Sequence, residues 1–255
     1  MALDVQTTDG ICRITIDRPE VDNRVDRATC LGIVDAFRGA DTDAKVRVIV
    51  LAASGNKFCT GGQVDGAADG AAFAQIQFAE AFGSVHEAAA DLAKPLIAAV
   101  NGDAVAGGFS LVSSADLAIS VDTAKFGLPE LGVGLFPMLA LATSIHLLPR
   151  KVLFDLIYNL RLLSADEALH YGLISSVVPR ERFDDAVMNQ ARRLARSSRI
   201  AIASGRRAFQ AMLDMPRSEA IRHGALALVQ LLATEDGRSA ARSFALGETP
   251  VWKDR

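Results

Sequence analysis

The sequence predicts an α/β domain followed by a helical C-terminal region, and three observations support this fold class. Short, almost continuous runs of β-branched and other apolar residues, typical of strands buried on both faces, occur at 46–52 and 96–100. A glycine-containing loop follows each run, and a segment with helical spacing of apolar residues follows each loop. From residue 164 onward the pattern is mostly helical. Strands, loops and helices that alternate in this way indicate an α/β domain.

The first elements of the chain are expected to be a β-hairpin and a helix. An Asp-Gly pair at 9–10 separates a short extended run at 5–7 from alternating apolar and polar residues at 11–16. Such a pair between two runs is a strong hairpin signal. Apolar residues at helical spacing then predict a helix over 26–37.

The remaining elements of the core follow the same alternation. They are a strand at 46–52, an alanine-rich helix at 71–92, a buried strand at 96–100, a short helix from about 109 to 114 and a strand at 116–121. The stretch 131–148 carries no Asp, Glu, Lys or Arg and approaches the length of a membrane span. Because Gly132, Gly134 and Pro137 interrupt it, we expect a buried loop and helix there instead.

The C-terminal part of the chain predicts helices. Ser164 and Glu167 have the spacing of a capping box, in which each side chain bonds the other residue's backbone amide. Two long amphipathic helices are expected at 184–212 and 218–241. A boundary near residue 190 divides the chain into a core of residues 1–190 and a helical region of residues 191–255.

Length and charge exclude several classes of protein. A chain of 255 residues, 50% of them hydrophobic, can bury a sizeable core as one large domain without disulfides or a structural metal. The 27 Lys and Arg residues against 30 Asp and Glu residues give a net charge of −3, and aromatic residues make up 6%. Nucleic-acid-binding proteins usually have a basic balance and stacking aromatic side chains, so this class is not expected.

Cysteine usage and the N-terminal residues predict a cytoplasmic protein. Cys12, Cys30 and Cys59 are odd in number and far apart, so neither a disulfide framework nor a metal site follows from them. The first ten residues lack the basic and apolar regions of a secretory signal peptide. We therefore expect neither a metal nor an association with membranes.

Two glycine-rich loops are candidate binding sites for an oxyanion. Thr60-Gly61-Gly62 and Ala106-Gly107-Gly108 each follow a strand, and glycine lets a ligand approach the backbone closely. Amides at the start of a helix point outward with partial positive charge, so one amide from each loop could bind the same oxyanion. For either loop alone, an ordinary tight turn is the alternative interpretation. Neither loop has the residues of a phosphate-binding P-loop or a dinucleotide fingerprint.

Glu130 is the candidate acid. It lies among apolar residues at 126–133, and burial there would raise its pKa so that it could both take and return a proton. A solvated loop carboxylate is the alternative. Structural roles are expected for Asp116, which opens a strand, and for the four histidines, His86, His146, His170 and His223. The arginines within 192–199 predict a solvated helix face, or a contact with an anionic ligand or a second subunit.

Seven short segments occur in order along nearly the whole chain. They are Ile14–Pro19 with Asn23, Lys57–Gly62, Lys94–Gly102, Ala106–Gly108, Ser114–Asp116, Lys125–Leu131, and Ser164–Ala168 with Gly172–Ile174. Together they resemble the enoyl-CoA hydratase/isomerase family of the crotonase superfamily. The resemblance implies a crotonase-like spiral of ββα units with a helical C-terminal region, assembled as a homotrimer or a dimer of trimers through that region.

The resemblance also implies a chemistry. Family members bind an acyl-CoA thioester and stabilise its enolate between two backbone N–H groups, which by motif position belong to Gly62 and Gly107. Coenzyme A is part of the substrate, and no separate cofactor is expected. Family hydratases use two glutamates; the second corresponds to Glu130, whereas the position of the first holds Ser110. One glutamate beside an oxyanion hole suffices for a 1,3-proton shift, so isomerisation of an enoyl-CoA double bond is expected, with Glu130 as the catalytic residue.

The substrate-binding residues expected from these motifs are Arg24, Phe58, Thr60 and Ser110. Arg24 stands where the family usually has alanine and suits a CoA phosphate, although a plain surface arginine fits the position equally well. Three alternatives to isomerisation stay open. The first is hydration of a 2-enoyl-CoA with water activated through Glu130, and the second is a non-catalytic acyl-CoA-binding protein. The third is thioester hydrolysis or another reaction of the family.

Overall fold

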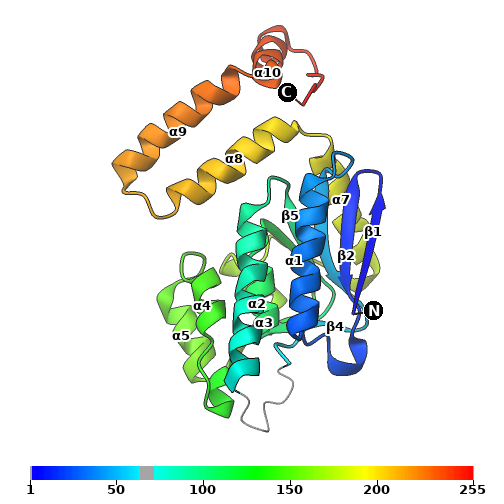
Figure 1. The fold of residues 1–255 in the computed structure, drawn as a ribbon, viewed down its shortest axis with the longest axis vertical. Coiled ribbons are helices and arrows are strands. Elements are labelled where there is room, and N and C mark those ends of the chain that lie inside the picture. The colour runs from blue at the N-terminus through cyan, green and yellow to red at the C-terminus, as the bar shows by residue number, and fades with distance from the viewer. Residues whose placement is uncertain (1, 64–71, 255) are drawn as a thin grey trace.

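Two β-sheets form the centre of the molecule, and helices surround them (Figure 1). The computed structural model describes residues 2–63 and 72–254. The larger sheet has six strands in the spatial order β1 Leu3–Thr8, β2 Ile11–Ile16, β3 Val48–Ala53, β5 Leu96–Val100, β7 Leu117–Val121 and β10 Ser176–Val178. β1 is antiparallel to β2, and all other neighbours in this sheet are parallel.

The smaller sheet is built from strands of three residues. They lie in the order β4 Lys57–Cys59, β6 Asp103–Val105, β8 Lys125–Gly127 and β9 Leu162–Ser164, and β9 is antiparallel to β8. β4, β6 and β8 follow β3, β5 and β7 along the chain, so that the chain alternates between the two sheets. A helix follows β4 and another follows β6, which confirms the expected spiral of ββα units.

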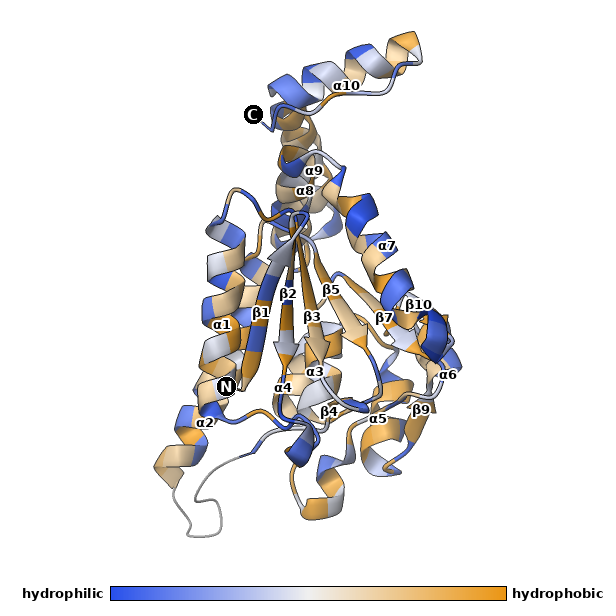
Figure 2. Cartoon of the chain, turned by 90° about the vertical axis from the view of Figure 1, so that its right-hand side faces the viewer, coloured by the Kyte–Doolittle hydropathy of each residue, from blue (hydrophilic) through white to orange (hydrophobic). Residues whose placement is uncertain are grey.

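The helices cover both faces of the larger sheet. α1 Arg27–Thr42, with α2 Ala72–Asp91 packed beside it, lies on one face, and α7 Phe183–Ala195 lies on the other (Figure 2). The shorter helices of the core are α3 Gly107–Ser113, α4 Met138–Ser144, α5 Arg150–Tyr158 and α6 Ala165–His170, with 3-10 helices at Pro19–Val21, Pro129–Val133 and Arg180–Arg182. α8 Arg199–Met212, α9 Arg217–Leu232 and α10 Glu235–Leu246 project away from the sheets as an arm (Figures 1 and 2).

Several local predictions are confirmed. Thr8 pairs with Ile11 across the hairpin turn, and Asp9 and Gly10 have φ values of 52° and 77°, as a two-residue type I′ turn requires. Every residue of β3 and of β5 is buried, as their continuous apolar runs predict. At the start of α6, both hydrogen bonds of the capping box between Ser164 and Glu167 are present.

The prediction of two long C-terminal helices is wrong, because each expected helix is two. The segment predicted at 184–212 is divided between α7 and α8, where the Ser198 side chain accepts a hydrogen bond from the amide of Ala201 and starts a new helix. The segment predicted at 218–241 is divided between α9 and α10, where Thr234 accepts from the amide of Gly237. A capping side chain at each break offers the backbone an alternative to a continuous helix.

The apolar stretch at 131–148 is less buried than predicted. It forms the end of a 3-10 helix, a short loop and α4, and Val133 and Met138 are 78% and 69% exposed. Most of its large apolar side chains therefore lie on the surface, whereas Pro137, Ala140 and Leu148 are buried. Among residues 2–63 and 72–254, no helix is both long enough and apolar enough to cross a membrane.

Candidate active site

The two glycine-rich loops meet at one edge of the smaller sheet. β4 and β6 are parallel neighbours, so the loops that leave their carboxyl ends lie side by side. A Cβ placed on Gly107 would stand 3.3 Å from the Cα and carbonyl carbon of Gly61, and one placed on Gly61 would stand 3.2 Å from the Cβ of Ala106. The topology thus brings together two loops that are more than forty residues apart in the sequence.

Each loop presents a backbone N–H group that its own secondary structure does not use. Gly62 forms a parallel bridge with Val25, in which the Gly61 carbonyl and the Gln63 amide make the hydrogen bonds, at 3.0 and 2.8 Å. The N–H of Gly62 therefore points away from Val25. Gly107 is the first residue of α3, and the first amides of a helix have no intrahelical acceptor. The two loops can therefore supply two donors to one oxygen atom.

Close packing explains why these positions are glycine. A Cβ at Gly108 would stand 1.9 Å from the carbonyl oxygen of Cys59, and one at Gly62 would stand 2.3 Å from Cζ of Phe78. Ala106 adopts φ 52° and ψ −121°, a conformation that residues with a side chain rarely occupy. Strained backbone of this kind is found mainly at functional sites.

One face of α2 covers the two glycines. The rings of Phe78 and Phe82 are stacked, with centroids 5.7 Å apart and an angle of 12° between their planes. Phe78 lies against Gly62, and the Cζ of Phe82 is 3.0 Å from the position of a Cβ on Gly107. Neither ring stands out as a single site residue in the sequence, although their spacing of four residues within the predicted helix places them on one face.

Glu130 lies beyond the carboxyl end of the next strand of this sheet. It belongs to the 3-10 helix that follows β8, and β8 is the parallel neighbour of β6. Its Oε2 atom is buried without a hydrogen-bond partner among the described residues. Burial raises the pKa of this carboxyl above its usual value, against a smaller opposing effect of a backbone hydrogen bond. A carboxyl with a raised pKa is suited to accept a proton and then return it.

Ser110 lies on α3 and points into the protein core. Its side chain is fully buried, and its hydroxyl donates a hydrogen bond of 2.8 Å to the carbonyl oxygen of Gly107. Its own carbonyl accepts from the hydroxyls of Ser113 and Ser114, at 3.1 and 2.9 Å. The hydroxyl proton of Ser110 is therefore used within the helix, and its role in binding substrate stays a prediction.

The other three predicted binding residues differ in exposure. Arg24 is exposed, and its Nε donates to the carbonyl of Val21 at 3.3 Å. Phe58 is fully buried in β4, and half-buried Thr60 donates from its hydroxyl to the carbonyl of Asp22 at 3.2 Å. Arg24 and Thr60 can thus meet a ligand at the surface, whereas Phe58 supports the loop from the core. Their roles toward a substrate stay predictions.

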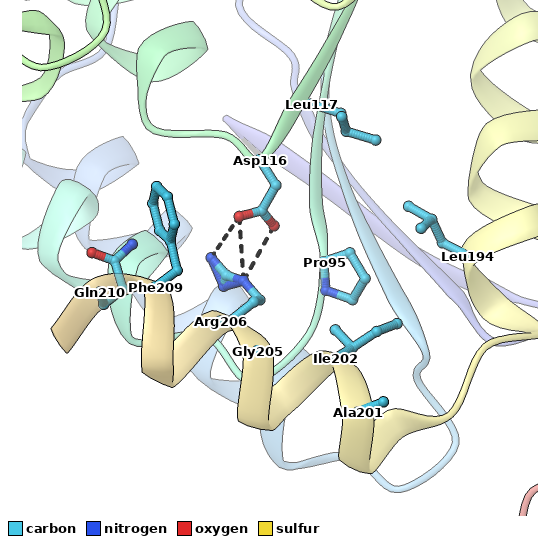
Figure 3. Close-up of a pocket in the computed structure, with 10 residues that line it drawn as sticks. All are labelled: Pro95, Asp116, Leu117, Leu194, Ala201, Ile202, Gly205, Arg206, Phe209 and Gln210. Carbon is cyan, nitrogen blue, oxygen red and sulfur yellow. Dashed lines mark hydrogen bonds and ion pairs between the residues drawn. The ribbon is translucent and has the colours of Figure 1, made fainter. Parts of the chain in front are cut away.

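A cavity of about 350 Å³ lies at the amino ends of β5 and β7, and no residue of the glycine loops or of the Glu130 segment lines it (Figure 3). Pro95 and Asp116, which precede β5 and β7, form one wall, and α8 forms the other. Asp116 accepts a hydrogen bond from the amide of Leu96 at 2.7 Å and pairs with Arg206 at 3.1 Å. These bonds agree with the structural role expected of Asp116. Within the described residues, no group of three or more His, Cys, Asp or Glu side chains could hold a metal ion.

Comparison with known proteins extends the resemblance to the whole chain. A family model described as enoyl-CoA hydratase/isomerase matches residues 6–255. Carnitinyl-CoA dehydratases of Salmonella enteritidis and Salmonella gallinarum are each 34% identical over 251 residues, which cover 96% of this chain and 95% of each relative. Human enoyl coenzyme A hydratase domain-containing protein 3 superposes with a TM-score of 0.95 at 28% identity, covering 99% of this chain and 100% of the other. An enoyl-CoA hydratase of Mycobacterium smegmatis gives 0.93 at 27% identity, covering 99% of each chain.

Proposed function

Because this chain belongs to the enoyl-CoA hydratase/isomerase family and is a crotonase-type acyl-CoA enzyme, we propose that it isomerises the double bond of an enoyl-CoA. The thioester oxygen would accept hydrogen bonds from the amides of Gly62 and Gly107. These donors stabilise the negative charge that develops on this oxygen when a proton leaves C2. In other enzymes, loss of one such donor raises the barrier by about 3–4 kcal/mol.

Glu130 carries the proton in this proposal. Its carboxylate takes a proton from C2 of a 3-enoyl-CoA, which gives a dienolate held by the two amides, and the resulting carboxylic acid returns a proton to C4. The double bond moves into conjugation with the thioester, and the carboxylate is regenerated. The raised pKa of Glu130 suits a group that must act as base and then as acid.

The observation that carries this proposal is the side chain at position 110. Two-glutamate hydration needs a second carboxylate there, and this chain has a buried serine whose hydroxyl bonds the Gly107 carbonyl. Loss of a general acid or base typically slows a reaction by about 10²–10⁴-fold. A proton shift needs one carboxylate, which Glu130 supplies.

Hydration or dehydration is the second candidate, and the names of the relatives favour it. The 34% identical relatives are named carnitinyl-CoA dehydratases, and the structural neighbour from Mycobacterium smegmatis is named an enoyl-CoA hydratase. In this version Glu130 alone would activate the water molecule that adds to C3 of a 2-enoyl-CoA.

Incubation in heavy water with a medium-chain 3-enoyl-CoA and its 2-enoyl isomer distinguishes these reactions by mass spectrometry. We expect conjugation of the 3-enoyl substrate with deuterium incorporation, and a loss of about 10²–10⁴-fold in rate in Glu130→Gln. A 3-hydroxyacyl product as the main product would establish hydration instead. Tight binding with neither product nor deuterium uptake would identify a non-catalytic acyl-CoA-binding protein. Unchanged turnover in Glu130→Gln would refute the role of Glu130.

A further inference from the structure

A buried histidine contacts the aromatic face that covers the oxyanion glycines. Phe78, Phe82 and His86 follow one another at intervals of four residues on α2, so they lie along one side of the helix. The edge of one ring meets the face of the other between Phe82 and His86, with centroids 4.7 Å apart and planes at 73°. Since Phe82 in turn lies against Gly107, the imidazole supports the ring that borders the Gly107 amide.

Hydrogen bonds connect the same histidine to Gly107 by a second route. Nδ1 of His86 lies 2.8 Å from the hydroxyl of Ser114, which donates to the carbonyl of Ser110 at 2.9 Å. The hydroxyl of Ser110 donates to the carbonyl of Gly107 at 2.8 Å. Because a hydroxyl has one proton and Ser114 gives it to Ser110, Ser114 accepts from an N–H at Nδ1 of His86. The imidazole is therefore the donor at the start of this series.

The protonation state of His86 suits a fixed structural donor. Burial lowers the pKa of His86 to about 4, so the ring is neutral at physiological pH. We assign its single proton to Nδ1, the nitrogen that bonds Ser114. Its Nε2 atom is buried without a partner among the described residues. The imidazole therefore does not change charge near neutral pH.

We propose that His86 is a positioning residue for the oxyanion amide of Gly107, acting through Ser114 and through Phe82. α3 has seven residues, and strained Ala106 precedes it, so contacts from outside must hold its first turn in place. The proposal rests on the oxyanion role of Gly107 proposed above. It assigns to His86 a function in catalysis although it does not touch the reacting atoms.

Four variants separate the two routes. His86→Phe keeps a ring against Phe82 and removes the donor to Ser114, whereas His86→Asn keeps an amide donor at the position of Nδ1 and removes the ring. Ser114→Ala removes the relay hydroxyl alone. Ser113→Ala is the matched control, because this hydroxyl also donates to the Ser110 carbonyl but pairs with Thr143 at 2.7 Å instead of with His86.

The strength of the two hydrogen bonds to the thioester oxygen can be measured in a variant that does not turn over its substrate. In a Glu130→Gln background, the infrared stretching frequency of a ¹³C-labelled thioester carbonyl reports how strongly bound 2-enoyl-CoA is polarised. We expect a downshift on binding that is reduced by His86→Phe and by Ser114→Ala, which break the hydrogen-bond route, and by His86→Asn, which removes the ring from Phe82. Ser113→Ala should retain the full downshift. With Glu130 present, kcat should fall about tenfold in the three weakened variants while KM stays within about twofold, since a misplaced donor loses part of the 10²–10³-fold effect of a full deletion.

The outcomes distinguish this proposal from the proposed reaction. If His86→Phe and Ser114→Ala keep the full carbonyl shift and kcat while their thermal midpoints fall, His86 is a structural residue and the proposal is wrong. No carbonyl shift in the parent protein would overturn the oxyanion site and the role of His86 together. A normal shift with hydration in place of isomerisation would revise the reaction and leave His86 supported. If His86→Phe fails to fold, the smaller change Ser114→Ala decides.

Discussion

Burial of the Glu130 carboxyl favours its neutral form, so this group makes the stability of the folded protein depend on pH. Because its pKa is raised in the folded protein, the stability contributed by the neutral carboxyl is fully present below the unfolded pKa and is lost as pH rises through the folded pKa. We expect Glu130→Gln to increase the free energy of unfolding at pH 7 relative to the native protein. Urea denaturation at pH 7 and pH 4 should show a difference that largely disappears at pH 4. An equal difference at both pH values would contradict the raised pKa.

The same group sets the expected pH dependence of activity. Only the ionised carboxylate can take the proton from C2, so kcat/KM should rise with pH through the raised pKa of Glu130 and then level off. The acid limb of the profile should therefore have its midpoint above 4.5, the ordinary value for this side chain. Steady-state rates measured between pH 4 and 9 check this, and a midpoint at or below 4.5 would exclude Glu130 as the base.

Ala106 stores strain beside the proposed oxyanion hole. A side chain at φ 52° and ψ −121° costs on the order of 1–3 kcal/mol, whereas glycine adopts positive φ freely but loses roughly 0.5–1 kcal/mol more conformational entropy. We therefore expect Ala106→Gly to stabilise the protein by about 1 kcal/mol in urea denaturation. Ala98→Gly in β5, where the backbone is regular and buried, is the control and should destabilise it. A loss of stability in Ala106→Gly would show that Ala106 is not strained.

At the scale of elements, the breaks between the C-terminal helices depend on single capping side chains. Thr234 caps α10, and Ser198 caps α8 and also donates to the buried carboxylate of Asp236. Loss of a cap typically costs about 1 kcal/mol. We expect Thr234→Ala to lower the free energy of unfolding by about that amount and Ser198→Ala by more, because the latter also removes a partner of Asp236. Exposed Ser218 on α9 provides a control, and equal effects at all three positions would contradict the capping roles.

The sequence predicts the elements that are long enough to show an apolar run or a regular hydrophobic period, or that carry characteristic turn or capping residues. The hairpin, β5 and the capping box of α6 were placed correctly, because turn residues and continuous apolar runs mark them locally. The strands of the smaller sheet were missed, since three residues are too few to show a period of two. These missed strands are the elements that bring the glycine loops and Glu130 to one edge.

The candidate site was predictable where its chemistry is local and was missed where it is tertiary. Gly62, Gly107 and Glu130 are recognisable from loop motifs, and the structure brings the two glycine loops together. Phe82 and His86 have the helical spacing of ordinary core residues, so nothing in their local sequence separates them from the rest of α2. Their relation to the site comes from the contacts of Phe82 with Gly107 and of His86 with Ser114, which periodicity does not reveal.

At the scale of the whole molecule, charged side chains fix the arm α8–α10 to the core. Arg206 pairs with Asp116 and donates to carbonyls at the end of α2, including those of Ala89 and Leu92, at 3.0 and 2.6 Å. Asp254, near the chain end, pairs with Arg47 of the core and with Arg199 of α8. The arm is therefore anchored at its base, and residues 2–63 and 72–254 leave its more distant surfaces exposed.

Those surfaces carry large apolar side chains, and we propose that residues 191–255 form the contacts of a homotrimer or of stacked trimers. These side chains include Phe209, Ile221, Leu226, Leu228, Val229 and Phe244, each more than half exposed. Large apolar side chains exposed in such number usually mark a protein interface.

A charge placed in that surface tests the proposal. Leu228→Asp should weaken subunit association by about tenfold or more, because a carboxylate would have to be buried without a partner. Light scattering coupled to size-exclusion chromatography should then show a smaller particle at micromolar concentration. Gln230→Asp adds the same charge at an exposed polar position of α9 and should leave the mass unchanged. Equal masses for the native protein and Leu228→Asp would remove this face of α9 from the interface, and a native protein that is already monomeric would refute the trimer.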